Sequence, residues 1–387
     1  MYNNSYIYRI MIKSYKYRLY PNKQQQKHLS QSIGCARYIY NKGLEEKIKC
    51  YQQTKKTLSY FDLANNFLIN EKNKHEWLKE PYSQILQTSL RNLDNAFKRF
   101  FHKKSNFPKF KKKNSINSIQ YPQNAKINCN NSKLILPKCG NIKIILHRKF
   151  NGKIKTVTIS KTPTNKYFAS IIIDDNKLVI SKKKFDETNS IGIDVGIRNF
   201  ITTSNGNKIE NPKYLEKSIN KINILQNKLL NKKYGSKNWN KSRIKLAKQY
   251  EKIKNQRYDF LHKLSSKLIS NNQAIIIEDL DIISLISKQN KYKLSKQISD
   301  ASWRCFIMFL EYKAKYNGKN ILKINRFDPS SKMCSTCGWI NNKLKLSDEK
   351  WKCKKCNTIH DRDTNAAKNI KNFYLIKPRL GRPVEPV

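Results

Sequence analysis

Four cysteines near the carboxyl end are spaced as ligands for a single metal ion. They form two CxxC pairs, with 15 residues between the pairs, in CSTCG and CKKC. Two such pairs can hold four thiolates about 2.3 Å from one Zn²⁺ and leave no open coordination position. The sequence therefore predicts a structural zinc ribbon over residues 330–360, with ligands Cys334, Cys337, Cys353 and Cys356. His360 is expected to act beside this site or elsewhere, without ligating the metal.

The other cysteines have no such spacing. With no export signal, the chain is expected in a reducing compartment, where cysteines stay unpaired unless they bind metal. They are predicted to be packed or free thiols: Cys35, Cys50, Cys129, Cys139 and Cys305.

Three acidic residues stand where a charge is unexpected. Asp194 lies in the apolar strand pattern IGIDVG, whose glycines allow another backbone to approach closely, and Glu278 follows the apolar run AIII. Asp363 begins the Ala- and Asn-rich helical pattern in HDRDTNAAKNI. A buried carboxylate without a partner is costly, and neighbouring carboxylates repel each other. A shared cation would relieve both problems, so the three acids are predicted to form one metal site.

The donor set indicates the metal and the reaction. Carboxylate ligands without a matching histidine cluster favour Mg²⁺ or Mn²⁺. Two such ions about 3.5 to 4 Å apart could activate a water and stabilise the leaving oxygen of a phosphodiester, so the predicted reaction is hydrolysis. Taken singly, Asp194 could lie in a turn, Glu278 could pair with a lysine and Asp363 could cap a helix. Asp361 is the weaker candidate for the third ligand.

The charge of the chain indicates its partner. Its 79 Lys and Arg against 27 Asp and Glu give a formal charge of +52. Nucleic acid fits this excess best, because lysines and arginines that neutralise phosphates release counterions and gain affinity. The alternative is a solvated basic surface without a partner.

A membrane partner is not expected. No apolar run approaches the roughly 18 residues of a spanning helix. The first 20 residues mix Tyr, Lys and Arg too evenly for a signal peptide. The protein is therefore expected to be intracellular, in the cytoplasm and associated with the nucleoid.

The first part of the chain is predicted to combine one strand with a helical lobe. Residues Lys13 to Leu19 alternate like a strand, and Pro21-Asn22 breaks the pattern. Apolar residues then recur at helical spacing from Lys23 to Ile48 and from Ser83 to Phe101.

A basic and aromatic segment follows this lobe. In KRFFHKKSNFPKFKKKN four phenylalanines are interspersed among cations, which suits stacking on bases and pairing with phosphates. The alternative is a solvated loop anchored by buried phenylalanines. The predicted nucleic-acid contacts are Lys98, Arg99, Lys103, Lys104, Lys109, Lys111, Lys112 and Lys113.

The rest of the chain is predicted to hold two further regions. Short alternating stretches between Lys133 and Asp174 predict a small β-barrel or sheet, and the main domain boundary is placed before Ser190. Beyond it the patterns predict a strand hairpin, two basic helices over residues 214–270, a buried strand at AIIIEDL, a helix over 299–316 and a strand over 321–326. The proline-containing tail, 372–387, is predicted to be disordered.

Taken together, IGIDVG, IIIEDL, CSTCG with CKKC, and DRDTNAAKNI resemble the transposon-encoded TnpB family, compact relatives of type V CRISPR effectors. KYRLYPNKQQQKHLSQSIGCARYIYN resembles the amino-terminal helical motif of that family, and FPKFKKK, LPKCGNIKI and GKIKTVTIS resemble its central β region. The resemblance covers residues 13 to about 372. Residues before Met11 have no counterpart, so the translation start could be Met1 or Met11.

The resemblance implies an α+β and α/β multidomain fold. An RNase H-like domain of the RuvC type (189–372) would carry Asp194, Glu278 and Asp363 as catalytic acids and contain the zinc ribbon. An oligonucleotide-binding β-barrel, the wedge, would comprise residues 1–20 and 121–188, with a helical recognition lobe (21–120) inserted and a tail at 373–387.

The resemblance also implies partners and an activity. A guide RNA from the transposon end would direct cleavage of double-stranded DNA beside a short flanking motif, with base pairing selecting the target. The protein would act as a monomer in a ribonucleoprotein with Mg²⁺ or Mn²⁺ and Zn²⁺.

Two other functions remain as alternatives. A nuclease-inactive, RNA-guided repressor would be expected to have lost acids, whereas all three are present. A transposase or accessory protein of the mobile element is the other alternative. The tyrosine-type transposases need a His-hydrophobe-His pair, which none of the six histidines forms.

Overall fold

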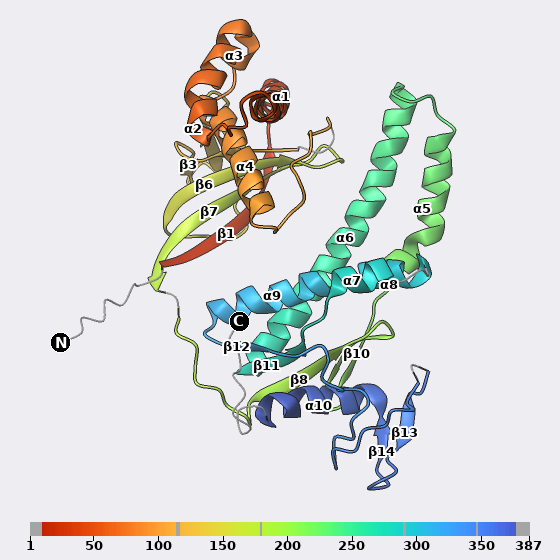
Figure 1. Cartoon of the computed structure of the whole chain (residues 1–387). Coiled ribbons are helices and arrows are strands. Elements are labelled where there is room, and N and C mark those ends of the chain that lie inside the picture. Colours follow the sequence, from red (N-terminus) through yellow and green to blue (C-terminus); the bar gives the residue numbers. More distant parts are fainter. Residues whose placement is uncertain (1–9, 114–116, 179, 289–291, 346, 377–387) are drawn as a thin grey trace, which may run out of the picture. The chain divides into compact units, whose positions relative to one another are not determined.

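The computed structural model describes residues 10–113, 117–178, 180–288, 292–345 and 347–376 (Figure 1). The chain divides into two compact units, residues 1–178 and 179–387. Within the described residues no helix is long and apolar enough to cross a membrane.

The first unit is built on a seven-stranded antiparallel sheet in the order β2-β6-β7-β1-β5-β4-β3. The first strand along the chain lies in the middle of this order, paired with β7 and β5. The strands are β1 (Ile10–Tyr20), β2 (Ser118–Tyr121), β3 (Lys126–Asn128), β4 (Lys133–Leu136), β5 (Gly140–Ile145), β6 (Lys153–Lys161) and β7 (Tyr167–Leu178).

Helices occupy the chain between β1 and β2. They are α1 (Lys23–Thr54), α2 (Tyr60–Asp62), α3 (Leu68–Lys74) and α4 (Ser83–Phe101), with a π-helical turn at Leu63–Phe67 and a 3₁₀ turn at Glu76–Leu78. Helix α1 starts where Asn22 and Gln25 cap each other's backbone N–H groups, at 2.8 and 3.0 Å. It runs past the predicted end at Ile48, because no breaker follows until Lys55 takes the left-handed conformation.

Helices α1 and α4 pack closely at a glycine. A Cβ at Gly43 would lie 2.8 Å from Leu90 Cδ2, so the Leu90 side chain would have to shift. Leu90 and its neighbour Leu93 are fully buried in the lobe core. The sequence pattern that predicted α4 therefore marks the face that packs on α1.

The second unit has a mixed five-stranded sheet in the order β10-β9-β8-β11-β12. Strands β8, β9 and β10 are antiparallel neighbours, while β11 runs parallel to both β8 and β12. The strands are β8 (Ser190–Val195), β9 (Asn199–Thr203), β10 (Lys208–Glu210), β11 (Ala274–Glu278) and β12 (Asn320–Ile324); β13 (Lys350–Lys352) and β14 (Ile359–Asp361) form a separate pair.

Helices pack on both faces of this sheet. The helices are α5 (Tyr214–Leu230), α6 (Lys237–Asn271), α7 (Ile282–Lys288), α8 (Tyr292–Ala301), α9 (Trp303–Tyr316) and α10 (Arg362–Ile376). Helices α6, α8 and α9 share one apolar core with the sheet, and α10 packs against the opposite face (Figure 1).

Two predicted helices end elsewhere in the structure. The helix expected over 299–316 is interrupted at Ser302, whose positive φ of 58° separates α8 from α9. The predicted disordered tail is wrong for residues 372–376, because α10 continues to Ile376 and its Phe373 and Tyr374 pack beside Ile370. The remainder of that tail, 377–387, lies outside the described residues.

The segment after β7 is bound to the second unit. The Lys183 backbone N–H donates to the Gly318 carbonyl at 2.9 Å, and Gln273 Nε2 donates to the Lys184 carbonyl at 3.0 Å. The Phe185 ring lies 5.4 Å from the ring of Tyr374. The structure thus divides the units between residues 178 and 179, about ten residues before the predicted boundary.

Candidate metal centres and nucleic-acid surfaces

Strand alternation places Asp194 and Glu278 on one face of the second sheet. Ile193 and Ile277, which precede them, both belong to the core with α6 and α9. Successive side chains of a strand point to opposite faces, so the two acids face the side that α10 covers. Strands β8 and β11 are parallel and Ile193 pairs with Ile277. The acids therefore lie at the carboxyl ends of two adjacent strands, at the same edge of the sheet.

A glycine brings α10 onto this face. A Cβ at Gly192 would lie 2.2 Å from the Ala367 carbonyl oxygen and 2.9 Å from the Lys371 backbone nitrogen, so only glycine fits. Gly192 and Asp194 are two positions apart and share a face of β8. Asp363 precedes Ala367 by four residues and lies on the same side of α10. This packing brings the third acid toward the first two.

The charge of Asp194 is disfavoured by its surroundings. Burial, followed by the nearby charges of Asp363 and Glu278, raises the pKa of Asp194 to about 8, although Arg362 opposes the shift. Burial, together with the charges of Asp328 and Asp279, raises the pKa of Glu278 to about 7. Near pH 7 the carboxyl groups of Asp194 and Glu278 therefore tend to bind protons, and a bound cation would displace these protons.

Asp361, the weaker candidate, has other partners. Its carboxylate pairs with Lys208 Nζ at 2.6 Å and accepts the Thr364 backbone N–H at 3.0 Å, at the start of α10. A carboxylate that caps a helix and pairs with a lysine is already satisfied. This arrangement favours Asp363 as the third acid.

A hollow of about 380 Å³ opens beside Glu278. Its lining combines four apolar residues with four acids and two cations, Arg304 and Lys323. Lys323 pairs with Glu311 at 2.9 Å, whereas Arg304 is exposed. Arg304 belongs to α9, which covers the face opposite to α10, so the hollow offers a cation beside the end of β11 and not on the face of the acids.

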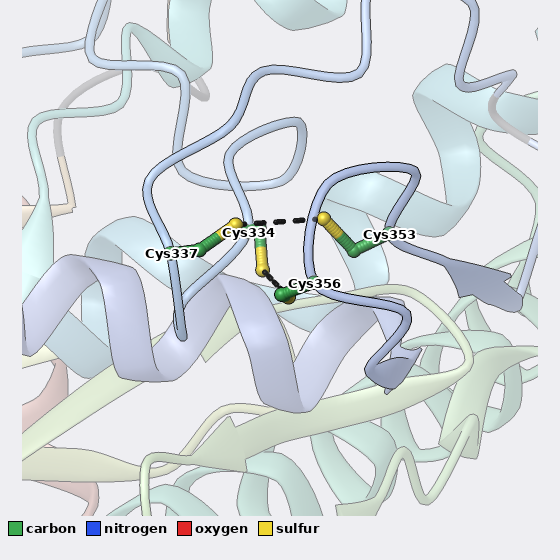
Figure 2. A group of neighbouring side chains, drawn as sticks. All are labelled: Cys334, Cys337, Cys353 and Cys356. Carbon is green, nitrogen blue, oxygen red and sulfur yellow. Dashed lines mark hydrogen bonds between the residues drawn. The ribbon is translucent and has the colours of Figure 1, made fainter.

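The four cysteines of the predicted ribbon meet at one point (Figure 2). Their sulfur atoms all lie within 4.8 Å of one another, and the Cys334–Cys356 and Cys337–Cys353 distances are both 3.6 Å. Tetrahedral zinc with bonds of about 2.3 Å requires sulfur separations of about 3.8 Å. The donor set therefore fits Zn²⁺. Among the described residues this is the only group of three or more potential ligands drawn together so tightly.

The two CxxC turns have the same local design. Gly338 and Asn357 each follow the second cysteine of a pair, and both have positive φ, of 76° and 58°. Their backbone N–H groups donate to the carbonyls of Cys334 and Cys353, at 2.9 and 3.0 Å. Glycine and asparagine are the residues that most readily adopt this conformation. The sequences CSTCG and CKKCN thus favour matching turns.

His360 supports the cysteine cluster from outside it. Its Nε2 lies 3.0 Å from Cys334 Sγ, and its ring packs on Trp351 at 4.8 Å between centroids. Burial lowers the pKa of His360, so the neutral ring can donate one N–H to a thiolate. The histidine is not among the four grouped ligands.

The remaining cysteines lie apart from any metal group among the described residues. Cys35 and Cys139 are buried, and burial raises the pKa of each thiol to about 11. Cys129 is exposed, while Cys50 and Cys305 are partly buried. No disulfide joins any of them within the described chain.

The basic segment after α4 exposes its aromatic rings. Phe101, Phe107 and Phe110 are 64%, 44% and 55% exposed, although the Phe107 ring packs edge-on against Phe97 and Phe100 at 5.5 and 5.3 Å. Lys111 also holds the loop, because its backbone exchanges two hydrogen bonds with the Asn41 side chain at 2.7 and 3.0 Å.

Most of the predicted cations in this segment are exposed. Lys111 is partly buried, with its ammonium over the Tyr40 ring, and Lys98 pairs with Asp94 at 3.0 Å. The exposed ones are Lys98, Arg99, Lys103, Lys104, Lys109, Lys112 and Lys113. Exposed rings and cations together form a surface suited to single-stranded nucleic acid.

The structure has a second surface of exposed aromatic rings and cations, which was not predicted from the sequence. At the tip of the α5–α6 hairpin Tyr234 is 81% exposed, and its ring lies 4.7 Å from that of Trp239. Arg243 lies over the Trp239 ring at 5.9 Å. The string KKYGSKNWNKSR carries the same mixture of aromatics and cations and could have identified this tip.

Three family models match the chain. They are described as "Probable transposase" over residues 170–289, "Cas12f1-like, TNB domain" over 303–370 and "Helix-turn-helix domain" over 11–56. The second match contains the four cysteines and Asp363. Over residues 11–56 the structure has one strand and one long helix.

Two of the relatives match nearly the whole chain. A protein of Streptomyces pristinaespiralis, described as a candidate RNA-guided DNA endonuclease, is 35% identical over 97% of this chain and 92% of its own length. A protein of Escherichia coli K12 with the same kind of description, InsQ, is 30% identical over 93% and 91%. A TnpB-like protein of Methanocaldococcus jannaschii is 30% identical over 57% of this chain and 78% of its own.

The fold is shared with a solved structure. The chain aligns with Cas12f1, determined by cryo-electron microscopy in complex with sgRNA and target DNA, at a TM-score of 0.58. The alignment covers 94% of this chain and 99% of Cas12f1, with 15% sequence identity. The mixed α/β architecture is therefore similar to that of Cas12f1.

Proposed function

Because the chain belongs to the TnpB family, whose members include proteins described as RNA-guided DNA endonucleases, we propose that it is an RNA-guided, metal-dependent DNA endonuclease. The observation that carries the proposal is the placement of Asp194 and Glu278 on the face of the second sheet that α10 covers, with Asp194 close enough to Glu278 and Asp363 for both charges to raise its pKa. A guide RNA from the transposon end would select the DNA target by base pairing.

The second unit would be an RNase H-like nuclease domain of the RuvC type. Three antiparallel strands followed by two parallel ones, with the acids on the central pair and on the last helix, support this assignment. The first unit would be the oligonucleotide-binding wedge, a β-barrel, with α1 to α4 as the inserted recognition lobe. Their position between β1 and β2 supports that division.

The residues of the acidic edge would each have a part in DNA hydrolysis. Asp194, Glu278 and Asp363 would hold Mg²⁺ or Mn²⁺, and carboxylate oxygens are the donors that these ions prefer. Such ions supply activation of a water and charge stabilisation at a phosphodiester. Arg304, in the hollow beside Glu278, would pair with a backbone phosphate and orient the strand. All three acids are present, which disfavours a nuclease-inactive repressor.

Guide replacement tests this function. The RNA that copurifies with the protein is sequenced, and its guide segment is then exchanged for one that matches another DNA site beside the same flanking motif. We expect the cut to move to the new site. Cleavage that ignores the guide, or a purified protein without a defined RNA, would overturn the proposal.

Cleavage at limiting metal should depend on pH. The pKa values of Asp194 and Glu278 are raised to about 8 and about 7, so protons compete with the metal below these values. The Mg²⁺ concentration for half-maximal cleavage should rise about tenfold for each pH unit between 7 and 6 per proton displaced. Titrating Mg²⁺ at several pH values measures this. A midpoint that stays constant from pH 8 to pH 6 would refute the competition.

Phe110 should contribute to RNA binding by stacking. Replacing Phe110 with alanine should weaken binding of single-stranded RNA by about 1–3 kcal/mol if a base stacks on the ring. Because the ring is 55% exposed, the melting temperature should stay unchanged. Phe61→Ala is the matched control, since Phe61 is 69% exposed in the same unit but lies outside the basic segment. Fluorescence anisotropy at fixed salt compares the two, and equal affinities would count against stacking at Phe110.

A further inference from the structure

Two buried asparagines of α10 bind the zinc-ribbon backbone. Asn365 Oδ1 accepts the Ser335 backbone N–H at 2.9 Å, and Asn365 Nδ2 donates to the Met333 carbonyl at 2.7 Å. Asn369 Nδ2 donates to the carbonyls of Met333 and Ser330, at 2.6 and 2.7 Å. The two side chains are 1% and 0% exposed. The segment that leads into the first CxxC turn is thus held by helix α10.

The same helix contacts the sheet with a different stripe of residues. Ala367 meets Gly192 of β8, and Ile370 packs on Ile276 of β11. Asp363 lies on this stripe by its spacing to Ala367, whereas Asn365 and Asn369 form a stripe of their own. Helix α10 therefore lies between the sheet and the ribbon, with its acid toward one and its amides toward the other.

The start of α10 has an additional link to the ribbon. The Arg362 backbone N–H donates to the Glu349 carbonyl at 2.8 Å, next to β13. Asp363 is the following residue. The ribbon is thereby bonded at two places to the first turn of α10, which carries the acid.

The side-chain amide of Asn369 bonds to the ribbon although its own oxygen is left without a partner. Asn369 Oδ1 is buried without a hydrogen-bond partner among the described residues. A buried unpaired acceptor is unfavourable, yet the amide is oriented so that both of its N–H groups meet ribbon carbonyls. A side chain that served only to fill space would be better replaced by an apolar one.

We propose that Asn365 and Asn369 are positioning residues that couple the zinc ribbon to Asp363, so that an intact ribbon sets the divalent-metal affinity of the acidic site. This inference rests on the proposed role of Asp363 as a metal ligand. Small displacements of a ligand weaken metal binding. Mutating a residue that orients a ligand without touching the metal typically lowers the metal affinity 10- to 100-fold.

The test measures Mn²⁺ binding to the full-length protein stripped of nucleic acid, by electron paramagnetic resonance. Asn365→Ala and Asn369→Ala are each expected to weaken Mn²⁺ binding about tenfold while the zinc content stays at one per chain. The matched control is Asn320→Ala. Asn320 is also buried and donates to a carbonyl, that of Lys183 at 2.9 Å, but it lies at the end of β12 opposite the acids.

A milder variant covers the case in which alanine prevents folding. Asn365→Gln keeps the amide donor and acceptor on a side chain one methylene longer and adds no charge, so it should weaken Mn²⁺ binding less than Asn365→Ala. A Mn²⁺ affinity that is unchanged in the Asn365 and Asn369 variants, with a stability loss like that of Asn320→Ala, would overturn the coupling.

A double-mutant comparison separates coupling from local damage. Cys353→Ser should weaken Mn²⁺ binding in the otherwise unchanged protein but add little in an Asn365→Ala, Asn369→Ala background. Fully additive losses would contradict the proposal. Asp363→Asn identifies the source of a failure, because an unchanged Mn²⁺ affinity in that variant would refute the proposed metal site itself.

Discussion

Replacing Asp194 with asparagine is expected to abolish DNA cleavage, by about 10³-fold or more, while guide RNA and target DNA still bind. The loss follows because metal ligation supplies several kcal/mol of charge stabilisation during phosphodiester hydrolysis. Nucleic-acid affinity should change less than about threefold, since it comes mainly from lysines and arginines. Single-turnover cleavage and filter binding with the same ribonucleoprotein measure the two effects.

The same substitution should stabilise the metal-free protein. The pKa of Asp194 is raised from 3.8 to about 8, so the folded state binds a proton more tightly than the unfolded state does. Stability from this group is therefore lost as pH rises toward 8, and the uncharged asparagine avoids that loss. At pH 8 we expect a higher melting temperature for Asp194→Asn without metal, and a Mg²⁺-induced increase only in the unsubstituted protein. Normal cleavage by Asp194→Asn would refute the assignment of the site.

Replacing Cys353 with serine is expected to remove the zinc and destabilise the second unit. Cys353 is fully buried, and its sulfur lies 3.6 Å from that of Cys337. Structural zinc contributes its binding free energy to folding, and a net loss of about 3 kcal/mol would lower the melting temperature by about 10 °C. Zinc content by elemental analysis and a thermal melt measure both effects.

Cys129→Ser provides the control for this prediction. Cys129 is exposed and lies apart from the cysteine cluster. It should keep one zinc per chain and an unchanged melting temperature. A full zinc content in Cys353→Ser would contradict the four-cysteine site.

The sequence was informative where a residue is chemically unlike its neighbours, such as a charged residue in an apolar strand. Asp194 and Glu278 end apolar strands, and a charge there needs a partner, so their importance could be inferred without any contact. The two CxxC turns also follow from spacing together with the glycine or asparagine after each pair. In both cases the deciding residues are close in sequence.

Long-range packing could not be inferred in the same way. The role of Gly192 depends on the Ala367 carbonyl 175 residues later, and the tether from Asn365 to Met333 depends on how the ribbon folds back. A glycine in a strand or an asparagine in a helix has many possible explanations until its partner is known. The sequence therefore indicated which residues carry charge and metal, but not how α10 connects them.

One error came from weighing composition above periodicity. The prolines beyond residue 376 suggested a disordered tail from Asn372, although Ile370, Phe373 and Tyr374 continue the apolar helix spacing. Helical spacing was the better guide there. The bonds between the Asn41 side chain and the Lys111 backbone, which hold the loop after α4, could not have been matched from sequence.

The central claim is that Asp194, Glu278 and Asp363 share bound divalent metal. The most direct test is a crystal structure of the protein with Mn²⁺ and an anomalous difference map. We expect one or two peaks that contact oxygens of all three side chains at about 2.1 Å, as for octahedral ions of this size. A fully occupied Mn²⁺ elsewhere, with no peak among these three carboxylates, would contradict the account.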